Sequence, residues 1–74
     1  MQGHQLRQRR LANNIPGLVV CSRAGVSRTR LSDIEREYVQ PRQEELARLN
    51  GALDELIAAR RKVEAVAAEV GWAL

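Results

Sequence analysis

The side chains best able to do chemistry in this chain lie close together, in the segment AGVSRTRLSDIE over residues 24–35. Arg28 and Arg30 carry guanidinium groups, whose forked donors can pair with two acceptors at once, on a phosphate or on the edge of a guanine. Leu31 and Ile34 are three residues apart, a spacing that places them on one side of a helix. The segment therefore predicts a short helix with one apolar side and one donor-rich side, a pattern suited to contacts with base edges in the major groove.

The residues around this helix predict how it begins and what precedes it. Gly25 is expected to end a short helix over residues 18–24, because glycine readily adopts the left-handed conformation common at helix ends. Ser27 can accept a hydrogen bond from the first turn of the next helix, which we predict over residues 27–37. The β-branched residues early in the first of these helices leave a strand over residues 18–21 as an alternative.

Helical patterns also occupy the two ends of the chain. Good helix formers predict a first helix over residues 4–13, and a proline begins the last one at Pro41. In this last segment eight of the nine heptad positions from Leu46 onward are apolar, with Arg60 the exception, as in a coiled-coil seam. Glycine costs a helix about 1 kcal/mol relative to alanine, so a kink or break at Asn50-Gly51 is an alternative.

These elements predict an all-α fold, a small helix-turn-helix bundle of four to five helices with a long C-terminal helix. Residues 1–54 are expected to form the helix-turn-helix domain, and residues 55–74 a helical extension for dimerisation or partner binding. Leu46, Leu49 and Leu53 can pack on the domain's own core, whereas the later apolar positions lie beyond the reach of so small a bundle.

Charge is distributed unevenly along the chain. Up to Arg42 there are eight arginines and three acidic residues, whereas the remainder has four basic and six acidic residues, and the net charge is +3. A basic front and a slightly acidic back suggest a polyanion as the partner of the front.

Several function classes find no support in the residues present. His4 has no partner at metal-ligand spacing and Cys21 is the single cysteine, so neither a metal site nor an internal disulfide is expected. Neither paired catalytic carboxylates nor a nucleophile beside a base is evident, so we expect no enzyme activity, no cofactor and no small-molecule ligand. No apolar run reaches the roughly 20 residues of a membrane span and no secretory signal is evident, so a bacterial or phage-infected cytoplasm is the expected location.

The motif AGVSRTRLSDIERE, residues 24–37, followed by Pro41 and by LARL at residues 46–49, resembles the lambda-repressor-like helix-turn-helix family, the XRE-type group of phage repressors and Cro. The resemblance extends from about Leu6 to Leu53. It implies sequence-specific binding of double-stranded operator DNA by a transcriptional regulator, most simply a Cro-type repressor that acts as a homodimer. The helix that carries the motif would enter the major groove.

The resemblance also assigns roles to individual side chains. The residues at base-contacting positions are Arg28, Thr29, Arg30, Ser32 and Asp33. Arg36 corresponds to a phosphate-contacting position, and we expect further phosphate contacts from Ser27, Arg10 and Arg42, the last at a helix start where backbone N–H groups are free. The positions that pack the two short helices together are Val20, Cys21, Val26, Leu31 and Ile34.

Some of these assignments have alternatives. A solvated charged surface is the alternative role for Arg10, Arg28 and Arg30. Asp33 could accept a hydrogen bond from a cytosine amino group, or pair along its own helix with Arg30 or Arg36.

Three positions depart from the family's pattern. The second helix begins Pro16-Gly17-Leu18 rather than Ser-Gln-Glu, so a side chain that often binds phosphate and braces the recognition helix is missing. Glu37 stands where the family commonly has a glycine at the end of the third helix. The family's break between its fourth and fifth helices falls at Asp54, which suggests that the two helices are fused into one.

The seam of the last helix is expected to join two copies of the chain, through Leu56, Val63, Ala67, Val70 and Leu74. The same helix could instead bind a different protein. A second hypothesis is therefore a protein-interaction module, antitoxin-like or an adaptor, that docks through this helix. The basic residues of the recognition segment argue against interaction as the sole role.

Overall fold

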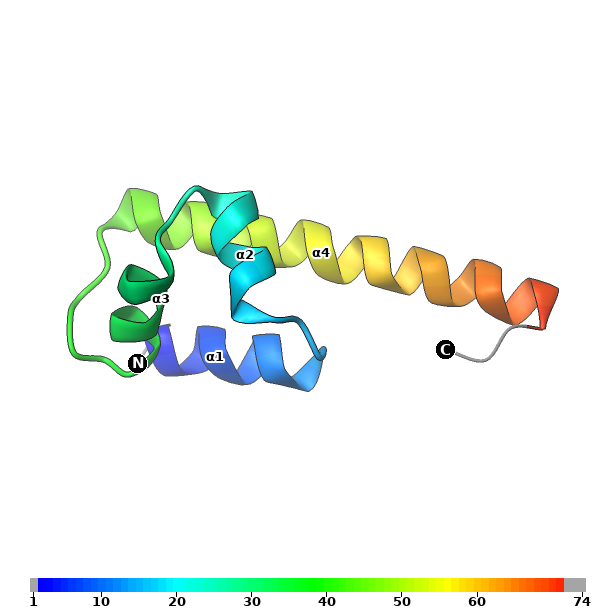
Figure 1. Cartoon of the computed structure of the whole chain (residues 1–74), viewed down its shortest axis with the longest axis horizontal. Helices are drawn as coiled ribbons and strands as arrows, with labels where there is room; N and C mark the ends of the chain where they lie inside the picture. Colours follow the sequence, from blue (N-terminus) through cyan, green and yellow to red (C-terminus); the bar gives the residue numbers. More distant parts are fainter. Residues whose placement is uncertain (1, 72–74) are drawn as a thin grey trace.

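The computed structural model describes residues 2–71, and in that range the chain forms four α-helices (Figure 1). Their bounds are α1 Gln2–Ala12, α2 Gly17–Ala24, α3 Arg28–Glu35 and α4 Gln43–Val70. No strand occurs in the described residues. The predicted all-α bundle with a long last helix is confirmed, and the alternative of a strand over residues 18–21 is excluded.

The turn between α2 and α3 has the predicted construction. Gly25 has a φ of 69°, in the left-handed region, and its N–H donates to the carbonyl oxygen of Cys21 at 2.9 Å. Ser27 directly precedes α3, and its Oγ accepts a hydrogen bond from the backbone N–H of Arg30 at 3.1 Å. These two contacts satisfy backbone groups that a helix end otherwise leaves without partners.

The core lies between α2, α3 and the first half of α4, and α1 packs against α3. Its most buried large side chains are Val20, Ile34, Leu49 and Leu53. The positions predicted to pack the two short helices are all buried: Val20, Cys21, Val26, Leu31 and Ile34. Of the leucines expected on the domain's own core, Leu49 and Leu53 are fully buried and Leu46 is half-buried.

α1 approaches α3 very closely at Gly3. This glycine is buried, and a Cβ atom at its position would overlap the backbone carbonyl oxygen of Ile34. Glycine is therefore required at this position by the distance between two helices. The sequence carries no signal for this contact, because α1 and α3 meet only in the folded chain.

α4 is continuous through Asn50 and Gly51, so the alternative break there does not occur. It also continues past Asp54, as the suggested fusion of two helices requires. Its second half extends beyond the ends of α1 and α2 (Figure 1). None of the helices over residues 2–71 is both long and apolar enough to cross a membrane.

Candidate nucleic-acid interface

The start of α3 presents polar side chains on the side away from the core. Ser27, Arg28 and Thr29 are exposed, and Ser32 and Asp33 are half-buried. On the opposite side Leu31 and Ile34 are 3% and 0% exposed. The core thus holds one side of α3 and leaves the other available to a ligand, which is the arrangement that a groove-binding helix needs.

Arg28 is the arginine of α3 best placed to reach such a ligand. It is exposed, and no ion pair within residues 2–71 involves it. It lines a shallow cleft between α3 and the start of α2, together with Gly17, Leu18 and Ser32. Since Gly17 has no side chain, no group from this position of α2 braces Arg28, and its guanidinium is accessible to a ligand.

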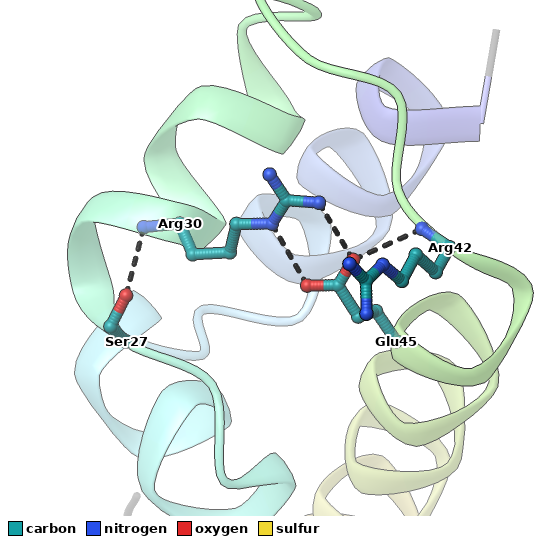
Figure 2. A network of polar contacts seen from close by, with 4 residues as sticks. All are labelled: Ser27, Arg30, Arg42 and Glu45. Carbon is teal, nitrogen blue, oxygen red and sulfur yellow. Dashed lines mark hydrogen bonds and ion pairs between the residues drawn. The ribbon is translucent and has the colours of Figure 1, made fainter.

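Arg30 differs from Arg28, because its guanidinium is directed toward the first turn of α4 (Figure 2). Its Nε donates to Glu45 Oε2 at 2.8 Å and its Nη2 to Glu45 Oε1 at 2.7 Å. The hydrogen bonds of this two-point pair raise the pKa of Arg30 above its ordinary value. The base contact expected of Arg30 stays a prediction, and it would require the side chain to leave Glu45.

The phosphate contact expected of Arg10 also stays a prediction, and in this structure the side chain is engaged within the domain. Arg10 donates through Nε and Nη2 to the two carboxylate oxygens of Glu35, at 2.8 and 2.9 Å, and through Nη1 to the carbonyl oxygen of Ile15 at 3.0 Å. The side chains of Arg10 and Glu35 are only 13% and 7% exposed. All three guanidinium nitrogens are thus engaged inside the domain, and the hydrogen bonds to Glu35 raise the pKa of Arg10.

The start of α4 forms a second cleft, which is lined by charged side chains. Arg30, Arg42 and Arg48 contribute its cationic groups, and Glu44 and Glu45 its carboxylates. Arg42 is the residue before the helix, and its side chain is exposed. Helix starts favour anions, and the phosphate contact expected of Arg42 stays a prediction. Arg48 was missed in the sequence, because its proximity to Arg42 depends on the helix that begins between them.

Two further predicted site residues of α3 are Asp33 and Arg36. Among the ion pairs within the described residues, none joins Asp33 to Arg30 or Arg36, so Asp33 is not held by the helical pair considered as its alternative role. Arg36 is exposed at the C-terminal end of α3.

Cys21 is a buried residue of α2. This burial raises the pKa of its thiol, in agreement with a packing role.

The face of α4 expected to join two copies is only partly available. Val63 and Val70 are 59% and 60% exposed, and Val66, which the heptad pattern omitted, is 54% exposed. Leu56 is partly buried against the domain's own core and Ala67 is 4% exposed within the single chain, and the seam expected through both stays a prediction. Leu74 lies outside the described residues.

Comparison with known protein families supplies an independent assignment. Residues 6–59 match the family described as Helix-turn-helix, which is the XRE type found in lambda repressor and Cro. No curated protein and no solved structure matches the chain. The matched segment includes α2, the turn at Gly25, α3 and the first half of α4, which together build the interface described above. The chain therefore belongs to the XRE-type helix-turn-helix family of DNA-binding transcription regulators.

Proposed function

We propose that this protein is a sequence-specific repressor of the Cro type, which binds operator DNA with α3 in the major groove. The observation that carries the proposal is the guanidinium of Arg28, which is exposed and in no ion pair with residues 2–71, at the first turn of a helix whose other side is fixed in the core. A guanidinium in this position can make a forked contact to guanine, which is worth about 1–3 kcal/mol of discrimination. Thr29, Ser32 and Asp33 are the further base-contacting candidates.

Phosphate contacts would orient α3 in the groove. We assign them to Arg42 and Arg48 at the start of α4, to Arg36 at the end of α3, and to Ser27. Arg42 and Arg48 share one cleft at the start of α4, and the N-terminal end of a helix favours an anion such as a phosphate. Contacts of this kind position a protein on the duplex and carry no sequence information themselves.

We further propose that two copies of the chain bind together, through the exposed valines of α4. Val63, Val66 and Val70 place a stripe of apolar surface on the part of α4 that extends beyond the other helices (Figure 1). Such a stripe is stabilised when a second copy covers it. A two-fold dimer would contact two half-sites about 34 Å apart, and the expected operator is therefore pseudo-palindromic.

The proposal is tested by selecting duplexes from a random library with the full chain and then measuring fluorescence anisotropy. The selected duplex and a scrambled duplex of the same composition are compared at two salt concentrations. Tight, preferential binding to the selected duplex supports a sequence-specific regulator, and the slope of affinity against salt, about −0.9 per phosphate contact, counts the backbone contacts. Failure to enrich any sequence, with weak equal binding to both duplexes, would reject it.

A second candidate function is a protein-interaction module that docks through α4, and the exposed valines favour it. The two functions differ in what the valines are needed for. In a repressor, replacing them weakens operator binding by separating the two copies. In an interaction module, the chain shows no sequence preference on DNA with or without them.

A further inference from the structure

The pair between Arg30 and Glu45 connects the recognition helix to the helix behind it. Glu45 lies in the first turn of α4, and its carboxylate also accepts a hydrogen bond from the backbone N–H of Arg42 at 3.0 Å (Figure 2). The backbone N–H of Arg30 is in turn bound by Ser27 Oγ. Both the backbone and the side chain of Arg30 are therefore fixed, one by the cap of α3 and the other by the cap of α4.

The Glu45 carboxylate is well suited to hold the Arg30 guanidinium in place. The side chain of Glu45 is 13% exposed, less than the 35% of Arg30. The hydrogen bonds from Arg30, followed by the one from the Arg42 backbone, lower the pKa of Glu45 to about 2. Glu45 is therefore ionised at every pH at which the protein would meet DNA, and an uncharged state does not compete with the pair.

The surroundings make the direction of the Arg30 side chain important. Arg42 and Arg48 line the same cleft, and in α3 the exposed Arg28 lies two residues before Arg30. Without its partner Glu45, the Arg30 guanidinium would lie in the cleft that Arg42 and Arg48 line and could join them on a phosphate, whatever the base sequence. Contacts to phosphates raise affinity for all duplexes alike and so reduce discrimination between them.

We infer that Glu45 is a positioning residue that sharpens DNA specificity by keeping Arg30 away from the phosphate backbone. Base discrimination is then left to Arg28 and its exposed neighbours, while the Arg30 side chain joins α3 to the first turn of α4. The inference rests on the proposed DNA-binding function, and it assigns an effect on specificity to an acidic residue that itself makes no DNA contact.

The test uses the full chain with Glu45→Gln, and with Glu44→Gln as the matched control. Both substitutions remove one negative charge from the same turn of α4, but Glu44 is exposed and takes part in no ion pair within residues 2–71. Glutamine at position 45 can still accept the hydrogen bond from the Arg42 backbone, since Gln also serves in a capping box. Circular dichroism confirms that each variant is folded before binding is measured.

For Glu45→Gln we expect binding to the scrambled duplex to rise by roughly five- to tenfold relative to Glu44→Gln, and its salt slope to steepen by about 0.9, the value for one added phosphate contact. The ratio of affinities for the selected and scrambled duplexes falls accordingly. A double variant, Arg30→Gln with Glu45→Gln, should lose the added binding, because the freed guanidinium is gone. A loss of stability alone would lower binding to both duplexes and would not produce this reversal.

Equal salt slopes and equal specificity ratios for Glu45→Gln and Glu44→Gln would overturn the inference, because the effect would then be one of net charge. So would a double variant that keeps the added binding. Failure of the proposed function looks different: the wild-type chain would then show no preference between the selected and scrambled duplexes.

Discussion

Arg10 and Glu35 form a largely buried, two-point ion pair that joins α1 to the last turn of α3. The same guanidinium also binds the carbonyl oxygen of Ile15, in the segment between α1 and α2. One side chain thereby connects three parts of the chain around the helix that we expect to enter DNA. The two residues are 25 positions apart in the sequence, so the pair forms only when α1 and α3 are packed together.

Removal of one partner of this pair is expected to destabilise the domain strongly. Arg10→Met leaves the Glu35 carboxylate buried without a counterion, a change that typically costs about 3–5 kcal/mol. In urea unfolding, Arg10→Met should therefore lower the midpoint concentration markedly. Arg7→Met, at an exposed position of the same helix, should change the midpoint little. If both variants unfold like the wild type, the pair is not the structural link described here.

Arg28 and Arg42 are expected to contribute to DNA binding in different ways. Arg28→Ala should relax base preference at one position in each half-site, because a base contact is lost. Arg42→Ala should weaken binding evenly across sequences and make the salt slope shallower by about 0.9, because a phosphate contact is lost. Repeating the duplex selection with each variant tests this, and an unchanged ranking of sequences for Arg28→Ala would show that another residue contacts the base.

The exposed valines of α4 predict the state of association. Val63→Asp combined with Val70→Asp introduces charges into the apolar stripe, so the two copies should separate. Sedimentation should then report the mass of a single chain, 8.3 kDa, where the wild type gives twice that value, and operator binding should weaken. An unchanged mass would place the contact between copies elsewhere.

Two glycines should respond in opposite directions to the same substitution. Gly51 lies within α4 with open space around its Cα, so Gly51→Ala should stabilise the protein by about 1 kcal/mol through helix propensity. Gly3→Ala should destabilise it, because the added methyl group overlaps the carbonyl oxygen of Ile34. Thermal unfolding measures both effects, and each variant serves as the control for the other. Stabilisation by Gly3→Ala would show that α1 and α3 are farther apart than described.

The pair at Glu45 predicts a dependence of stability on acid. Because its pKa in the folded chain is lowered from 4.5 to about 2, its contribution is complete above pH 4.5 and is lost as the pH falls toward 2. The difference in unfolding free energy between the wild type and Glu45→Gln should therefore shrink over that interval. A difference that stays constant down to pH 2 would mean that the carboxylate is not selectively stabilised in the folded chain.

Local features of the sequence were sufficient to predict the fold class and the two short helices. The all-α character, the cap at Ser27, the turn at Gly25 and the buried pair Leu31 and Ile34 all depend on residues within one or two turns of each other. Such interactions depend only on residue type and on short spacings along the chain, both of which can be read from the sequence. The first half of α4 was predictable for the same reason, although its start lies at Gln43 rather than at Pro41.

The partners of the arginines within the domain were decided only by tertiary structure. Arg10 and Arg30 form ion pairs with carboxylates 25 and 15 residues away, whereas Arg28 and Arg42 form none with residues 2–71. The close approach at Gly3 and the shared cleft of Arg42 and Arg48 likewise depend on how the helices are arranged. A guanidinium makes its strongest contacts with whichever anion the fold brings near it, and that distance is a property of helix packing that local spacing does not encode.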